Sequence, residues 1–164
     1  MTKKADIDFT NSADRKPQKG LADISVTVLS FGYKEGIPPE ANIVFDVRFL
    51  KNPYWIDELR PLTGKDQAVQ DYVLNQTVAK EFLASISELL IGLLPKLKEL
   101  NIADFSIAFG CTGGQHRSAT LAEALSKQLA SLYPEANIKV KHRELESCNA
   151  CASVTIAPES VNED

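Results

Sequence analysis

The sequence of 164 residues lacks the two kinds of segment that would direct it into or across a membrane. Its opening stretch holds no apolar core of the length that a secretory signal needs, and no later apolar run is long enough to span a bilayer. Cysteine is also scarce, because Cys111, Cys148 and Cys151 are too few and too unevenly spaced for a disulfide framework. We therefore expect a cytoplasmic protein in a reducing compartment.

An excess of positive charge is missing as well. The 18 Lys and Arg residues face 22 Asp and Glu residues, which gives a net charge of −4 and a pI near 5.3. This balance argues against a protein wrapped broadly in nucleic acid. The hydrophobic content of 44% and the charged content of 24% are ordinary for a globular protein, and the length suits one domain.

Regular patterning is absent from both ends of the chain. We expect residues 1–20 to form a flexible polar arm, residues 21–145 to form the folded domain, and residues 146–164 to form a soft acidic tail. Cys148 and Cys151, with His142 upstream, supply only half of a zinc site. Because no second Cys-x-x-Cys pair exists, we expect no metal ion, and nothing in the sequence indicates a cofactor.

Apolar patterning in the folded part alternates between strands and helices. Strands are expected over 24–29, 43–49, 105–109 and 137–142, with helices before residue 101 and after residue 117. Strands separated by helices imply right-handed crossovers. The sequence thus predicts an α/β class, with a single domain and a largely parallel sheet covered by helices.

The first helical region carries an apolar stripe at three- and four-residue spacing, which predicts the face that packs on the sheet. Its members are Val78, Phe82, Ile86, Leu89, Leu93, Leu97 and Leu100. Pro95, with Gly92 before it, is expected to kink or split this helix.

Two features lie beside the second strand. Asp46 and Arg48 interrupt its apolar run near the end where parallel sheets place ligand crevices, so they form either a structural pair or part of a site. The connection over 50–66 is longer than most, which is typical of a lid or a binding wall. We interpret its Tyr54 and Trp55 as aromatic anchors of the loop in the core rather than as a platform for a sugar ring.

The most informative stretch is the glycine loop, residues 110–118, which joins the third strand to the helix that follows. Adjacent glycines allow backbone N–H groups to turn inward, and a helix start adds unpaired donors and the positive end of its dipole. Arg117 and Ser118 could join these donors around a phosphate. The plain alternative is a turn that leads into a helix capped by Ser118 or Thr112.

The glycine loop also has the cysteine-to-arginine spacing of cysteine-dependent phosphatases, with five residues between Cys111 and Arg117. In that chemistry a thiolate attacks phosphorus while an arginine holds the equatorial oxygens. A general acid cannot be assigned from the sequence among Asp46, Asp57 and Asp66. Phosphatase activity with Cys111 and Arg117 as catalytic residues therefore stands as the enzymatic alternative to a binding role.

Several motifs in order along residues 24–145 resemble the C-terminal domain of the RapZ (YvcJ) family, whose best-studied member is an RNase adaptor. They are SFGYKEGIP, FDVRFLKNP, LRPLTG, GCTGGQHRS and the His142-Arg143 pair. The resemblance implies a phosphofructokinase-like α/β domain that self-associates and binds glucosamine-6-phosphate or a nucleotide sugar. The implied ligand-binding residues are Ser30, Lys34, Asp46, Arg48, Cys111, Thr112, Gly113, Gly114, Gln115, His116, Arg117 and Ser118.

The sequence departs from this family in two respects. Full-length members carry a P-loop domain, and no G-x-x-x-x-G-K-[ST] motif occurs here, so nucleotide hydrolysis is not expected from this chain. RNA-binding members continue into basic residues where Glu144 and Glu146 stand in this sequence. Lys34, Lys139, Lys141 and Arg143 could form a small basic patch, so RNA or an RNase stays an open alternative as partner.

Overall fold

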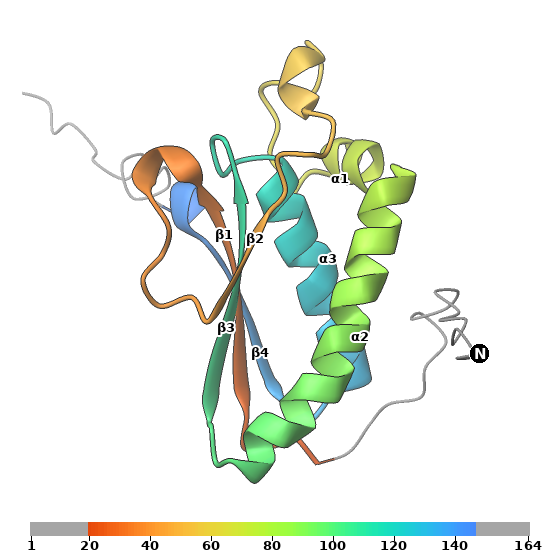
Figure 1. Cartoon of the computed structure of the whole chain (residues 1–164). Helices are drawn as coiled ribbons and strands as arrows, with labels where there is room; N and C mark the ends of the chain where they lie inside the picture. Colours follow the sequence, from red (N-terminus) through yellow and green to blue (C-terminus); the bar gives the residue numbers. More distant parts are fainter. Residues whose placement is uncertain (1–19, 147–164) are drawn as a thin grey trace, which may run out of the picture.

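The computed structural model describes residues 20–146 as one α/β domain built on a four-stranded, fully parallel sheet (Figure 1). The strand order is β2-β3-β1-β4, with β3 and β1 in the centre. The expected fold class is therefore confirmed. The strands are β1 (Ser25–Gly32), β2 (Ile43–Asp46), β3 (Asp104–Cys111) and β4 (Asn137–His142).

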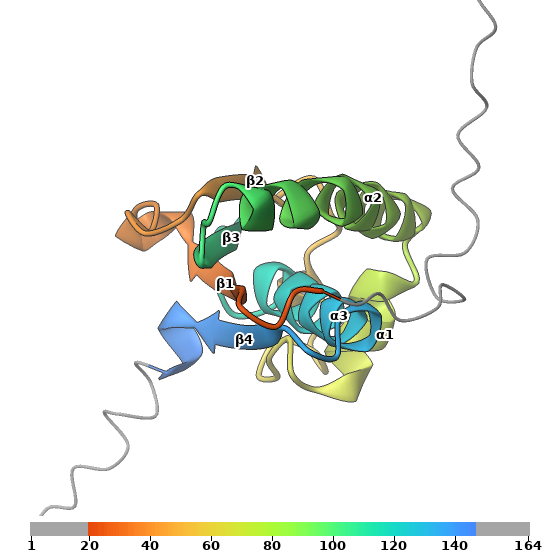
Figure 2. The same ribbon diagram turned by 90° about the horizontal axis from the view of Figure 1, so that it is seen from below.

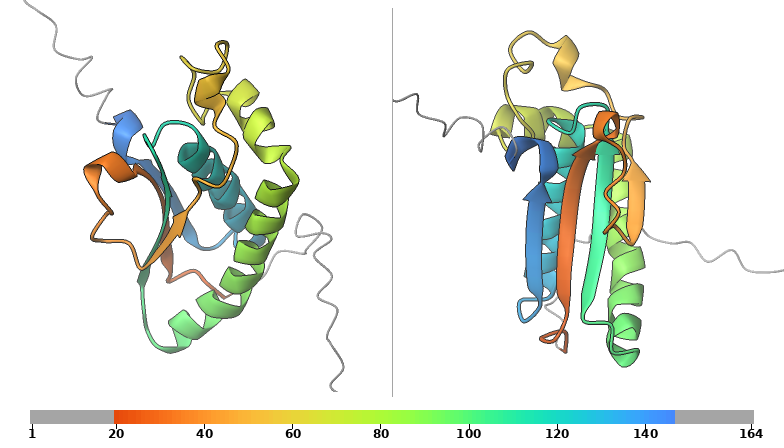
Figure 3. Two further views of the ribbon diagram at one scale, coloured as in Figure 1. Left: turned by 45° about the horizontal axis from the view of Figure 1, so that its top comes forward. Right: turned by 90° about the vertical axis from the view of Figure 1, so that its left-hand side faces the viewer.

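The three α-helices lie on one face of this sheet, as Figures 2 and 3 show. The crossovers from β2 to β3 and from β3 to β4 step across the sheet in the same direction, so right-handed connections place their helices on the same side. The connection from β1 to β2 steps the opposite way and covers part of the other face. The helical segments are η1 (Tyr33–Glu35), η2 (Pro53–Trp55), α1 (Gln67–Leu74), α2 (Thr77–Glu99) and α3 (Arg117–Leu132).

The main core lies between the sheet and the helices. Alternate residues of β1 and β3 point inward and are almost wholly buried, with Val26 paired to Phe105 and Val28 to Ile107. Each fully buried side chain of this size contributes about 1.5–3 kcal/mol. A smaller apolar cluster on the outer face, centred on Phe31, is covered by the β1–β2 connection. Both central strands are thus apolar on both faces near their carboxyl ends.

Helix α2 corrects parts of two predictions. Of the predicted stripe, Ile86 is buried as expected, whereas Val78, Leu89 and Leu100 are exposed, and the helix also packs through Ala79, Leu83, Leu90 and Leu94. The helix also runs through Pro95 without splitting, since Thr77–Glu99 is one helix. Proline removes only one donor and its fixed φ is helical, while the buried leucines before it hold the segment in place. The helical region before residue 101 is instead interrupted between α1 and α2, at residues 75–76.

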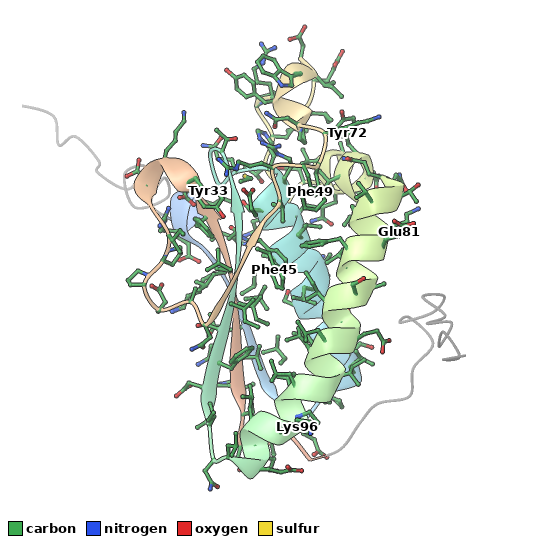
Figure 4. All side chains as sticks on the ribbon, in the orientation of Figure 1. Tyr33, Phe45, Phe49, Tyr72, Glu81 and Lys96 are labelled. Atoms are coloured by element: carbon green, nitrogen blue, oxygen red, sulfur yellow. The ribbon has the colours of Figure 1, made fainter. Side chains whose placement is uncertain are left out.

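Aromatic side chains join the β2 edge to α2. Figure 4 shows Phe45 and Phe49 on the side of β2 that faces α2. The Phe82 ring of α2 lies 5.6 Å from the Phe45 ring and 5.2 Å from the Phe49 ring, both edge to face. These contacts fix the chain that leaves β2 toward the predicted site. Over residues 20–146, none of the helices has both the length and the apolar character that a bilayer crossing requires.

Two glycines provide a test of how tightly the loops are packed. A Cβ on buried Gly64 would collide with the backbone of His116 and Thr120, whereas a Cβ on Gly92 in α2 would meet nothing within 4 Å. We expect Gly64→Ala to lower the free energy of unfolding by about 1–3 kcal/mol, and Gly92→Ala to raise it by about 0.5–1 kcal/mol. Urea unfolding of both variants measures the difference, and equal stability of Gly64→Ala and the parent would contradict the packing.

Candidate functional site

A pocket of about 520 Å³ lies at the carboxyl edge of the sheet, where the glycine loop faces η1 and η2. This edge is where parallel sheets bind ligands. In Figure 1 the loop between β3 and α3 lies below the η2 segment. The lining residues are Lys34, Asn52, Tyr54, Trp55, Cys111, Thr112, Gly113, Gln115, His116 and Arg117.

Backbone donors of the glycine loop are available to a ligand. The N–H groups of Gly113, Gln115 and His116 have no hydrogen-bond partner among residues 20–146. Gly114 adopts a φ of +73°, which favours glycine and turns the chain into α3. Helix α3 starts without a side-chain cap, because His116 stands at the N-cap position; the predicted cap Ser118 lies inside the helix, with its Oγ 3.1 Å from Cys111 Sγ. Unpaired donors at a helix start suit an anion.

Two buried side-chain atoms beside these amides also lack a partner in the described chain. They are Nε2 of His116 and Nε of Arg117, which belong to side chains that are only 6% and 5% exposed. A buried polar atom without a partner costs about 1–3 kcal/mol. Both atoms are enclosed by protein, so they are polar groups that residues 20–146 leave unsatisfied next to the pocket.

Both terminal nitrogens of Arg117 donate hydrogen bonds to the protein itself. Its Nη1 donates to the backbone oxygens of Arg48 and Leu50, each at 3.0 Å, and Nη2 donates to Thr112 Oγ1 at 3.3 Å. Arg117 thus ties the segment after β2 to the glycine loop. The phosphatase hypothesis gains no support from this geometry, because it requires the guanidinium fork to face the phosphoryl group.

Asp46 and Arg48 form an exposed ion pair outside the pocket lining. Arg48 Nη2 lies 2.6 Å from Asp46 Oδ2, and its guanidinium stacks 4.4 Å from the centroid of the Tyr33 ring. Hydrogen bonding from Arg48 holds the pKa of Asp46 below its usual value. Burial and the Asp46 charge raise the pKa of Tyr33. Asp46 and Arg48 thus neutralise each other at the end of β2, and neither charge needs a ligand as its partner.

Ser30 lies away from the pocket and is fully buried. Its Oγ is hydrogen-bonded to Nδ1 of His142 at 2.8 Å, and Nε2 of the same histidine meets Glu123 Oε1 at 3.0 Å. Lys34, by contrast, lines the pocket, is exposed, and has no partner within residues 20–146. The pocket therefore gathers Lys34 and most of the glycine loop, and leaves out Ser30, Asp46, Arg48, Gly114 and Ser118.

The pocket has an aromatic wall that was not predicted from the sequence. Tyr54 and Trp55 were predicted as core anchors, yet they are 48% and 76% exposed, with ring centroids 5.5 Å apart. The anchor is Pro53, which is buried at the start of η2, and Asn52 Oδ1 accepts the N–H of Tyr54. This Asn-Pro turn projects the two following side chains outward. Aromatic residues that directly follow an Asn-Pro turn near a strand end are the feature of the sequence that could have indicated this exposed wall.

Metal-binding clusters of three or more His, Cys, Asp or Glu residues do not occur within residues 20–146. Cys148 and Cys151 lie outside the described residues. The same holds for the predicted arm before residue 20 and for most of the predicted acidic tail.

Comparison with known sequences identifies the family. Residues 24–146 match the profile described as the RapZ C-terminal domain. The chain belongs to the RapZ C-terminal domain family. A nucleotide-binding protein of Mycobacterium avium is 51% identical over 126 residues, which cover 76% of this chain and 42% of that protein. Nucleotide-binding proteins of Bacillus licheniformis and a Ruegeria species are 50% and 49% identical, and the match covers 74% of this chain and 40% of each relative.

The chain spans about two-fifths of the length of the curated relatives it matches. The matched part contains the whole sheet, the pocket and the segment after β4. The name of those relatives therefore describes proteins that are more than twice as long as the shared RapZ C-terminal domain.

Arg117 provides a test of the link between the RapZ glycine loop and the segment after β2. Arg117→Lys keeps the charge but lacks the two terminal nitrogens that together bind the Arg48 and Leu50 carbonyls and the Thr112 hydroxyl, so we expect the free energy of unfolding to fall by about 1–3 kcal/mol. Exposed Arg60 also donates to a carbonyl, that of Tyr54 at 3.1 Å, which makes Arg60→Lys a matched control. The control should change stability by less than about 0.5 kcal/mol. Equal urea midpoints for the two variants would contradict the anchoring role.

The Asp46–Arg48 pair predicts a pH dependence. Because the pKa of Asp46 is lowered in the folded state, its contribution to stability is present above the usual value of 3.8 and is lost as pH falls through the lowered value. Asp46→Asn should therefore be less stable than the parent at pH 7 and equally stable near pH 2. Thermal unfolding between pH 2 and pH 7 measures the difference, and a gap that widens in acid would contradict this sign.

Proposed function

We propose that this domain is a regulatory module that binds a phosphorylated amino sugar such as glucosamine-6-phosphate, or a related nucleotide sugar. One observation carries the proposal. Gly113, Gln115 and His116, whose amides have no partner within residues 20–146, line one pocket together with the exposed cation of Lys34. Backbone donors at a helix start, assisted by a lysine, are a recurrent way to hold a phosphate.

The opposite wall of the pocket supports the sugar part of this proposal. Tyr54 and Trp55 expose their rings beside the polar glycine loop, so a pyranose ring can rest against them while its phosphate meets the amides. Asn52 lies on the same wall and offers an amide to sugar hydroxyls. A pocket with one anion-binding wall and one aromatic wall favours a ligand that has both kinds of group.

Family membership supports a binding role rather than a catalytic one. The curated relatives are named nucleotide-binding proteins, and this chain corresponds to the part of them that is described as the RapZ C-terminal domain. A partner such as RNA or an RNase would have to be recognised without Arg143. That side chain is committed to the backbone oxygens of Gly32 and Gly36. Lys139 and Lys141 stay on the outer face of β4 for such contacts.

Trp55 makes the proposal directly testable, because it is the only tryptophan of the chain. Glucosamine-6-phosphate should change its emission in a saturable way and raise the melting temperature, since the ligand binds only the folded state. Lys34→Gln should weaken binding about tenfold through loss of one charge-assisted contact. Fluorescence titration and thermal shift measure both effects.

The control for this titration is Lys141→Gln, which removes the same charge from an exposed lysine beside a different hollow of the sheet. Its affinity should stay within about twofold of the parent, because Lys141 does not line the pocket and exposed charges are screened by salt. If none of the sugar phosphates and nucleotide sugars tested gives a saturable response, the proposed function is wrong.

A further inference from the structure

The two residues that follow β4 hold both backbone groups of Gly32, the last residue of β1. Glu144 Oε1 accepts the N–H of Gly32 at 2.7 Å, and Arg143 Nη2 donates to the Gly32 carbonyl at 2.7 Å. Arg143 also donates to Glu144 Oε1 from Nε at 3.0 Å and from Nη2 at 2.8 Å. We call residues 142–144 the strap.

The strap is fixed in place by contacts with residues that do not line the pocket. His142 is only 4% exposed, and its ring lies between Ser30 Oγ and Glu123 Oε1. The Arg143 guanidinium also lies 5.5 Å from the centroid of the Phe31 ring. Buried, fully used hydrogen bonds of this kind hold a side chain in one geometry. The position of Glu144 is thus set by contacts that do not involve the pocket.

Gly32 transmits this position to the glycine loop. A Cβ on Gly32 would lie 2.8 Å from the carbonyl carbon of Gly113 and 2.9 Å from the Gly114 nitrogen, so these main chains are in direct contact. A Cβ on Gly114 would collide with Glu144 Oε2 and would lie 2.8 Å from the Gly32 nitrogen. Glu144 Oε2 is itself buried without a partner among residues 20–146. The carboxylate therefore packs against the back of the loop whose front faces the pocket.

We propose that Glu144 is a positioning residue for the ligand-binding loop, acting through Gly32 and by direct contact with Gly114. It does not line the pocket, so it sets the orientation of the loop amides without touching the ligand. This inference rests on the proposed function, because the loop amides are its phosphate donors. The negative charge of a carboxylate behind an anion site opposes anion binding. Glu144 therefore favours binding only through its hydrogen bond to Gly32 and its packing against Gly114.

Two substitutions separate geometry from charge. Glu144→Asp keeps the charge but is one methylene too short to reach the Gly32 N–H, whereas Glu144→Gln keeps the reach and an acceptor oxygen but loses the charge. We expect Glu144→Asp to raise the Kd for glucosamine-6-phosphate about tenfold and Glu144→Gln to raise it by less than about threefold. Trp55 emission and calorimetry measure these constants. Glu146→Asp is the matched control, since Glu146 accepts the N–H of His142 at 3.1 Å, and it should bind as the parent does.

Amide hydrogen exchange of the ligand-free proteins gives a second measurement. The peptide that covers residues 111–118 should exchange faster in Glu144→Asp than in the parent, Glu144→Gln or Glu146→Asp. Parent-like affinity of Glu144→Asp, or equal losses in the Asp and Gln variants, would overturn the positioning role. If the parent responds to no sugar phosphate, the proposed function fails, and exchange alone then decides whether Glu144 orders the loop. Equal exchange in all four proteins would reject that role.

Discussion

The pocket depends on main-chain segments that approach one another too closely for any Cβ between them. Gly32 rests on the main chain of Gly113, and Gly64 rests on the first turn of α3; Gly110 in addition leaves room for the side-chain rings of Phe31 and Tyr33. These contacts join the end of β1 and the turn at residue 64 to the glycine loop and the start of α3. Because close-packed backbones cannot deform independently, the end of β1, the turn at residue 64 and the glycine loop behave as one unit. The geometry of the anion-binding wall follows from this packing.

Arginines complete this unit by binding backbone carbonyls rather than carboxylates alone. Arg117 holds the oxygens of Arg48 and Leu50, and Arg143 holds those of Gly32 and Gly36. A planar fork suits this task because one side chain can satisfy two carbonyl groups that would otherwise lose their partners. Arg117, which the sequence motif assigns to a phosphate, therefore mainly stabilises the fold around the pocket.

The strands and the glycine loop were predictable because their signals are local. An alternating or continuous apolar run followed by glycines specifies a strand and a turn within a few residues, as β3 illustrates. The buried face of α2 was not predictable from spacing, because leucines occupy adjacent positions such as Leu89 and Leu90 and fit two stripes equally well. The aromatic wall was missed for another reason: exposure of Tyr54 and Trp55 is set by the buried Pro53, a tertiary contact that residue type does not reveal.

The charges that remain unpaired around the pocket bear on the size of the proposed ligand. Arg48 is paired with Asp46, and the Nη1 and Nη2 groups of Arg117 are engaged by the protein, so Lys34 is the exposed cation that the pocket lining offers. Backbone amides and one lysine neutralise a single phosphate well, whereas a nucleoside triphosphate carries more charge than they can meet. A pocket of about 520 Å³ with an aromatic wall also matches a small ring-bearing ligand. Charge and shape therefore support the proposal of a sugar phosphate, rather than a nucleoside triphosphate, as the ligand of this site.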